Sequence, residues 1–117
     1  MRTFIATMSY EVSAETPADA RKLLRAELVG RRWKDMVRDR RMPRHTVWIQ
    51  RSADDEQTTS DLHDLCASEL RAAARAVAAT GRHVRVLRAF IQVAGGGTFG
   101  LTPEGFFDVP DGGEHAS

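Results

Sequence analysis

Apolar and polar residues alternate along residues 3–12, with Ile5 as the exception on the polar side. A period of two is typical of a strand that buries one face and leaves the other in water. We therefore predict a strand here, and its buried face carries Phe4, Ala6, Met8, Tyr10 and Val12.

Apolar residues recur every three or four positions in two later stretches, which predicts two amphipathic helices. The first follows Thr16, a suitable N-cap, and Pro17, a suitable first helical residue, and it ends at Gly30. The second begins within residues 58–60 and ends at Gly81. Its stripe runs for four turns and consists of Leu62, Leu65, Cys66, Glu69, Leu70, Ala73 and Val77.

Residues 33–41 and 45–51 predict the two arms of a hairpin that bends near residues 42–44. The second arm, TVWIQR, contains the stronger strand formers. Residues 83–93 predict a long last strand in which the alternation breaks. Val84 and Val86 fall on one face, while Leu87, Ala89, Ile91 and Val93 fall on the other. The break indicates either a bulge near Leu87 and Arg88 or a strand that is covered on both faces.

The order strand, helix, strand, strand, helix, strand predicts an α+β protein of the ferredoxin-like βαββαβ type. In that arrangement two helices cover one face of a four-stranded antiparallel sheet. We expect the uncovered face to carry Ile5, Trp48, Leu87, Ile91 and Val93. That is too much apolar surface to leave in water, so we predict a homodimer that stacks or joins its sheets. We assign residues 1–94 to this domain and residues 95–117 to a glycine-rich joint and an acidic tail.

The charge of the chain is segregated, although the net charge of the 117 residues is only +1 at pH 7. Residues 31–51, here called the basic ribbon, contain eight Arg or Lys, two Asp and both tryptophans, Trp33 and Trp48. Residues 54–69 contain six acidic and no basic residues, and the chain after Gly100 contains four acidic and no basic residues. The ribbon is therefore either a charged strand surface balanced by these acids or a contact surface for a polyanion.

The single cysteine, Cys66, excludes an intrachain disulfide and suits a reducing compartment. No apolar run approaches the about 20 residues that a membrane-spanning helix needs, and the N-terminal residues lack the apolar core of a signal peptide. We therefore expect a cytoplasmic protein with no membrane partner. His63 and Cys66 have the i, i+3 spacing of metal ligands, but Cys66 lies in the apolar stripe, and we predict that it packs in the core.

Residues 2–93 resemble the small ferredoxin-like proteins of bacterial defence systems, namely the CRISPR-associated adaptation nuclease of this fold and the GhoS-type antitoxin ribonuclease. The resemblance is carried by Tyr10 and Glu11 at the end of the first strand, a tryptophan near the second strand, the strand TVWIQR, the second helix and the apolar last strand. In the adaptation nuclease the position after that tyrosine is usually Asp, paired with its symmetry mate around a metal. The resemblance implies that Glu11 is a catalytic residue and a ligand of a divalent cation such as Mg²⁺.

The leading hypothesis is a small nucleic-acid-binding protein, a defence or toxin–antitoxin component with metal-dependent nuclease activity. Basic side chains neutralise phosphates and flat rings stack on bases, so we predict contacts to RNA or DNA from Arg38, Arg40, Arg41, Arg44 and Trp48. One alternative is a non-catalytic dimerisation or regulatory module that binds protein. Another is a dimeric α+β-barrel enzyme that acts on a small molecule.

Overall fold

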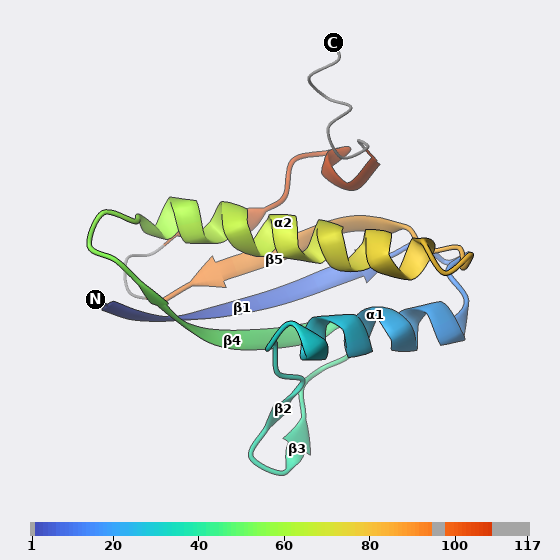
Figure 1. Cartoon of the computed structure of the whole chain (residues 1–117), viewed down its shortest axis with the longest axis horizontal. Coiled ribbons are helices and arrows are strands. Elements are labelled where there is room, and N and C mark those ends of the chain that lie inside the picture. The colour runs from blue at the N-terminus through green and yellow to red at the C-terminus, as the bar shows by residue number, and fades with distance from the viewer. Residues whose placement is uncertain (1, 95–97, 109–117) are drawn as a thin grey trace.

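The computed structural model describes residues 2–94 and 98–108 and has the predicted α+β class (Figure 1). Four antiparallel strands form the main sheet in the order β4-β1-β5-β6, and β2 and β3 form a separate pair. The elements are β1 (Arg2–Val12), α1 (Ala18–Gly30), β2 (Met36–Val37), β3 (Arg40–Arg41), β4 (Thr46–Ala53), α2 (Thr59–Ala78), β5 (Val86–Val93), β6 (Thr98–Leu101) and the 3-10 turn η1 (Phe106–Asp108).

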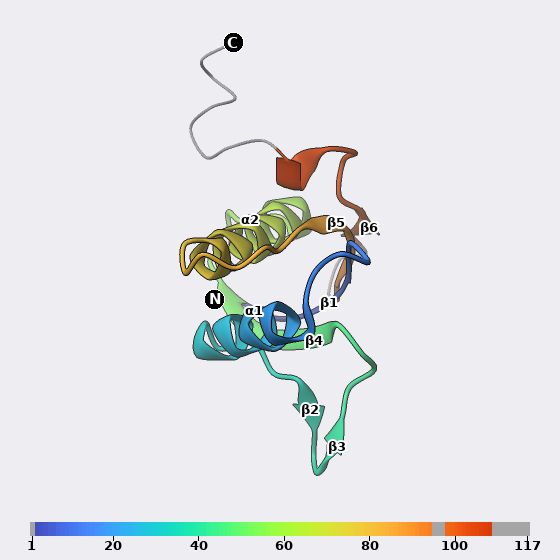
Figure 2. The same ribbon diagram turned by 90° about the vertical axis from the view of Figure 1, so that its right-hand side faces the viewer.

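The strand β1 lies at the centre of the sheet, between β4 and β5. The alternation predicted for it is confirmed, because Phe4, Ala6, Met8, Tyr10 and Val12 are all buried while Ile5, on the opposite face, is 46% exposed. The helices α1 and α2 lie side by side over the buried face (Figure 2). The core is therefore a single layer between the helices and one face of the sheet.

The helix α2 starts as its sequence predicts. The Thr58 side chain accepts a hydrogen bond from the Asp61 backbone N–H, and the Asp61 side chain accepts one from the Thr58 N–H. The predicted N-cap of α1 is wrong, since Pro17 occupies that position and the Thr16 hydroxyl instead contacts Ser13 and the Arg85 backbone N–H. Neither described helix is long and apolar enough to cross a membrane.

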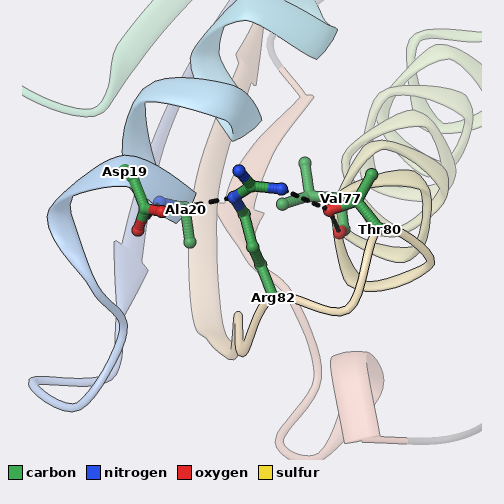
Figure 3. A network of polar contacts seen from close by, with 5 residues as sticks. All are labelled: Asp19, Ala20, Val77, Thr80 and Arg82. Atoms are coloured by element: carbon green, nitrogen blue, oxygen red, sulfur yellow. Dashed lines mark hydrogen bonds and ion pairs between the residues drawn. The ribbon is translucent and has the colours of Figure 1, made fainter.

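One polar network joins the start of α1 to the end of α2 (Figure 3). Arg82 lies after α2, and its Nε is 3.2 Å from Oδ2 of Asp19 in the first turn of α1. Its Nη1 donates to the Thr80 hydroxyl, which donates to the Val77 carbonyl over 2.6 Å. The network fixes the two helix ends beside each other above the sheet.

The main sheet has four strands, as predicted, but they are not the four predicted strands. The strand β6 is its fourth strand, and the first arm of the hairpin lies outside it. The main chain of the first arm, residues 33–41, pairs with β4 through one bridge between Lys34 and Trp48 among the described residues, with N–O distances of 2.7 and 2.9 Å. After this bridge β2 pairs with β3 and turns away from the sheet. On the other side of the bridge Trp33 turns into the core, where it is 1% exposed, so the arm does not extend along the edge of β4 in that direction either.

The broken alternation in the last predicted strand is a bulge. Val86 pairs with Val12 and Arg88 pairs with Glu11, so Leu87 is the extra residue. Because the bulge resets the alternation, Ile91 and Val93 lie in the core, and their predicted place on the uncovered face is wrong. The exposed apolar residues near that face are Ile5, Leu87, Phe90 and Leu101.

Residues 98–108, assigned from sequence to the tail, contact the rest of the fold. The strand β6 pairs with β5, and Thr102 is buried and exchanges hydrogen bonds with Ala89. Phe106 and Phe107 are partly buried against the core. The expected glycine joint at residues 95–97 and the acidic residues beyond 108 lie outside the described residues.

Candidate nucleic-acid interface

The hairpin β2–β3 carries three of the predicted contact residues away from the body of the protein. It projects from the β4 side, whereas η1 lies at the opposite end (Figures 1 and 2). Arg38 lies in its turn with φ of 56°, and Arg40 and Arg41 form β3. All three are exposed. Arg38 and Arg40 form no ion pair within the described ranges, so their charges face solvent.

Trp48 attaches this hairpin to the sheet. Its Nε1 donates to the Met36 carbonyl over 2.9 Å, and the Lys34 ammonium lies 4.8 Å from the ring centroid. The ring is half-buried. These contacts use its N–H and the side of the ring that Lys34 occupies, so Trp48 positions the basic hairpin in addition to the stacking role predicted for it.

Trp33, the other tryptophan of the ribbon, is a core residue. Its Nε1 donates to Oε1 of Glu69 over 2.9 Å, and the same oxygen accepts a hydrogen bond from Arg51 over 2.8 Å. Trp33 is therefore not available to stack on a ligand, and of the two tryptophans in the basic ribbon only Trp48 can do so. Arg51 is the ribbon residue for which the predicted pairing with the acidic stretch 54–69 is confirmed.

A second group of cations, absent from the predicted contact residues, lies beside Arg44. Arg21, Lys22 and Arg25 of α1 line a groove of about 180 Å³ together with Ala18, Arg44 and His45. Their i, i+1, i+4 spacing places them on one flank of the helix. This spacing can be read from the sequence, but nothing in the sequence near these residues shows that they lie beside residues 44 and 45. We call this surface the basic groove.

The charges around the basic groove are only partly balanced. Arg25 lies 3.5 Å and Arg41 3.7 Å from the same oxygen of Asp35. Arg21 is held by main-chain carbonyls, those of Thr16 and Ser13, which carry no net charge. Lys22 and Arg44 form no ion pair in the part of the chain that the structure describes. Of these five cations only Arg25 and Arg41 pair with a carboxylate, and both pair with Asp35, so the groove favours an anion.

His45 closes one side of the groove in a left-handed backbone conformation, with φ of 58°. Its ring stacks on Tyr10 with centroids 5.2 Å apart, and its carbonyl accepts a hydrogen bond from the Tyr10 N–H. Burial lowers the pKa of His45, and the nearby Arg44, Arg21 and Arg25 lower it further. The imidazole is therefore neutral near pH 7 and can exchange hydrogen bonds with a phosphate without adding charge.

Tyr10 is buried beneath His45, and burial raises its pKa to about 12. Its hydroxyl has no hydrogen-bond partner among the described residues. A cavity of about 20 Å³ that Tyr10 lines with Arg25 and Arg44 adjoins the basic groove. The tyrosine acts on the groove through His45, whose ring it supports.

Glu11 lies on the uncovered face of β1, away from the basic groove. Its Oε1 accepts a hydrogen bond from Nε of Arg88 over 2.8 Å, and both side chains are exposed. Within residues 2–94 and 98–108 no group of three His, Cys, Asp or Glu side chains is arranged to hold a metal. The predicted divalent cation at Glu11 would therefore need further ligands and the release of Arg88.

Cys66 is buried in the core, as predicted. Burial raises the pKa of its thiol to about 12, so the thiol stays protonated at neutral pH and is unsuited to nucleophilic or metal chemistry. His63 instead lies 3.6 Å from its neighbour Asp64.

Comparison with known proteins finds no matching family model, no matching curated protein and no matching solved structure.

Proposed function

We propose that this protein binds nucleic acid through the basic groove and the adjoining β2–β3 hairpin. One observation carries the proposal: cations from α1 and from the residues before β4 surround one groove whose described lining contains no carboxylate. Arg41 and Arg44 also line the adjoining cavity, which links the groove to the hairpin that carries Arg38 and Arg40. A phosphate backbone laid along this surface would meet successive cations.

The test is fluorescence anisotropy with labelled single- and double-stranded RNA and DNA, beginning at about 50 mM salt, where phosphate contacts are strongest. Lys22→Gln with Arg44→Gln removes two unpaired cations of the groove. We expect weaker binding and a slope of log K against log salt that is shallower by about 1.4 to 1.8, since each lost contact removes about 0.7 to 0.9.

The control is Arg85→Gln with Arg88→Gln, which removes the same charge at exposed positions outside the groove lining. It should bind much as the wild-type protein does. Equal weakening by both double variants would show that only net charge matters. Absence of any binding at low salt would contradict the proposed function.

We further propose that the fold is a ferredoxin-like variant in which the second strand is reduced to the Lys34 bridge and the β2–β3 hairpin. The order β1, α1, β4, α2, β5 and the antiparallel pairing of β1 with both β4 and β5 support this proposal. The proposed nucleic-acid-binding function includes a cytoplasmic role in defence or in a toxin–antitoxin pair. Nuclease activity through Glu11 and Mg²⁺ is a subsidiary proposal, and Glu11→Gln should abolish metal-dependent cleavage while leaving binding intact.

We also propose that the protein is a homodimer that covers the uncovered face of the sheet. Ile5, Phe90 and Leu101 are exposed there at 46%, 41% and 60%. Phe90 and Leu101 are cross-strand partners, so they form one apolar patch. The same patch supports the alternative of a non-catalytic module that binds protein. Light scattering at micromolar concentration that gave a monomer mass would exclude the dimer.

A further inference from the structure

The outer edge of β4 is only partly covered. The Tyr10 N–H donates to the His45 carbonyl, and the same register continues along β4. The main-chain groups of odd-numbered β4 residues therefore point towards β1, and those of even-numbered residues point outward. Lys34 uses both outward groups of Trp48. The N–H and C=O groups of Gln50 and Ser52 have no partner in the part of the chain that the structure describes.

The edge is open because the chain leaves α1 too abruptly to cover it. Arg32 adopts φ of 79° directly after the helix, and Trp33 then turns into the core and bonds to Glu69. Among the described residues, no strand therefore pairs with β4 beside Gln50 and Ser52. Unpaired edge groups of this kind accept an added strand.

A groove of about 510 Å³ runs beside this open edge. It is lined by Arg31, Arg32, Ile49, Gln50, Arg51, Ser52 and Glu69. Arg31 is paired with Glu27 at 3.3 Å and Arg51 with Glu69 at 2.8 Å, whereas Arg32 forms no ion pair within the described ranges. The lining thus combines free main-chain groups with an excess of positive charge.

We propose that the open edge of β4 binds an extended acidic peptide as an added strand. Four main-chain groups, the N–H and C=O of Gln50 and Ser52, would pair with the peptide, and Arg32 would meet its carboxylates. A second copy of this chain fits less well, because a twofold pairing of the same edge would bring Arg31, Arg32 and Arg51 of both copies together. This surface does not include the lining of the basic groove, so the proposal is independent of nucleic-acid binding.

The probe is a labelled seven-residue peptide of alternating valine and glutamate with blocked ends, and the control peptide carries lysine in place of glutamate. We expect the acidic peptide to bind and the basic one not to bind. Two further acidic peptides carry N-methyl groups on alternate amides. Only one of these two sets can face the edge, so one peptide should lose affinity by about 2- to 10-fold per lost hydrogen bond while the other binds as before.

Protein variants test the same contacts from the other side. Ser52→Pro removes an outward N–H that has no partner in the described fold, and Ser52→Thr keeps it. We expect Ser52→Pro to weaken peptide binding by about 2- to 10-fold and Ser52→Thr to leave it unchanged. Arg32→Gly removes the cation at a φ that glycine adopts readily, so the fold is kept while peptide affinity falls by about 2- to 5-fold.

Several results would overturn the proposal. Equal binding of the acidic and basic peptides would exclude charge recognition, and equal effects of the two N-methylated peptides would exclude strand addition. If Ser52→Pro instead converted a dimer to a monomer in light scattering, the occupant would be a second copy. If Arg32→Gly and Ser52→Pro weakened oligonucleotide binding and left peptide binding unchanged, the edge would belong to the nucleic-acid surface.

Discussion

Replacing Glu69 by alanine removes one carboxylate on which two residues of the basic ribbon depend. Oε1 of Glu69 accepts hydrogen bonds from Trp33 Nε1 at 2.9 Å and from Arg51 at 2.8 Å. Trp33 is 1% exposed, so its indole N–H depends on Glu69 as its acceptor. The substitution therefore tests directly whether Trp33 is a buried structural residue or a surface available to a ligand.

The expected cost follows from these two contacts. Leaving a buried donor unpaired costs about 1–3 kcal/mol. The pair with Arg51 adds about 1 kcal/mol or less, because both side chains remain about one-fifth exposed and water screens their attraction. Glu69→Ala should therefore lower the free energy of unfolding by about 1–4 kcal/mol. Glu69→Gln keeps an acceptor for the indole and should cost only about 1 kcal/mol.

The measurement is equilibrium unfolding in urea followed by circular dichroism, because tryptophan fluorescence would itself respond to the change. Trp33→Phe supplies the matched background, since it removes the indole donor and keeps an aromatic ring in the core. In that background Glu69→Ala should cost only the Arg51 contribution. A cost below about 1 kcal/mol in the wild-type background, or the same cost in both backgrounds, would refute the reasoning.

The remaining predictions concern the hairpin, the groove and the C-terminal part of the fold. Trp48→Phe removes the donor to the Met36 carbonyl, so it should lower the free energy of unfolding by about 0.5–1.5 kcal/mol and also weaken nucleic-acid binding by releasing the hairpin; unchanged binding would contradict the positioning role. The pKa of His45 is lowered in the folded protein, so the unfolded chain binds more protons and stability should fall as the pH drops below 6.5 towards the folded pKa. His45→Asn, which tolerates the same φ, should flatten this dependence in urea unfolding at each pH, and an unaltered slope would assign it to other groups. A bound oligonucleotide should raise the pKa of His45 in an NMR titration, because phosphates stabilise the imidazolium, and no rise would place the nucleic acid elsewhere. Thr102→Val leaves the buried Ala89 N–H without its side-chain acceptor and should cost about 1–3 kcal/mol in urea unfolding, whereas no loss would mean that the contact after β6 is dispensable.

The elements predicted correctly are those whose signals are local. The alternation of β1 and the start of α2 within residues 58–60 depend on residues a few positions apart, and steric and hydrogen-bonding preferences over that range do not need the rest of the fold. The bulge at Leu87 was visible as a break in period, although the sequence left open a strand covered on both faces.

The candidate site was predicted in part. Arg38, Arg40, Arg41 and Arg44 are exposed on or near one hairpin, as a hydrophilic ribbon suggests. The contributions of Arg21, Lys22 and Arg25 were missed, because a helix flank of cations is also the ordinary solvated side of an amphipathic helix. Only the packing of α1 beside residues 44 and 45 makes the two groups one groove.

Periodicity and composition over short windows are enough to predict the α+β class, the two helices, the buried face of β1 and the segregation of charge. The roles of the two tryptophans follow only from the packed fold. Trp33 bonds to Glu69 across 36 positions of sequence and leaves the edge of β4 open, whereas Trp48 holds the basic hairpin. Such a choice depends on which distant acceptor the fold brings within hydrogen-bonding distance of each indole N–H, and local preferences carry no information about that distance.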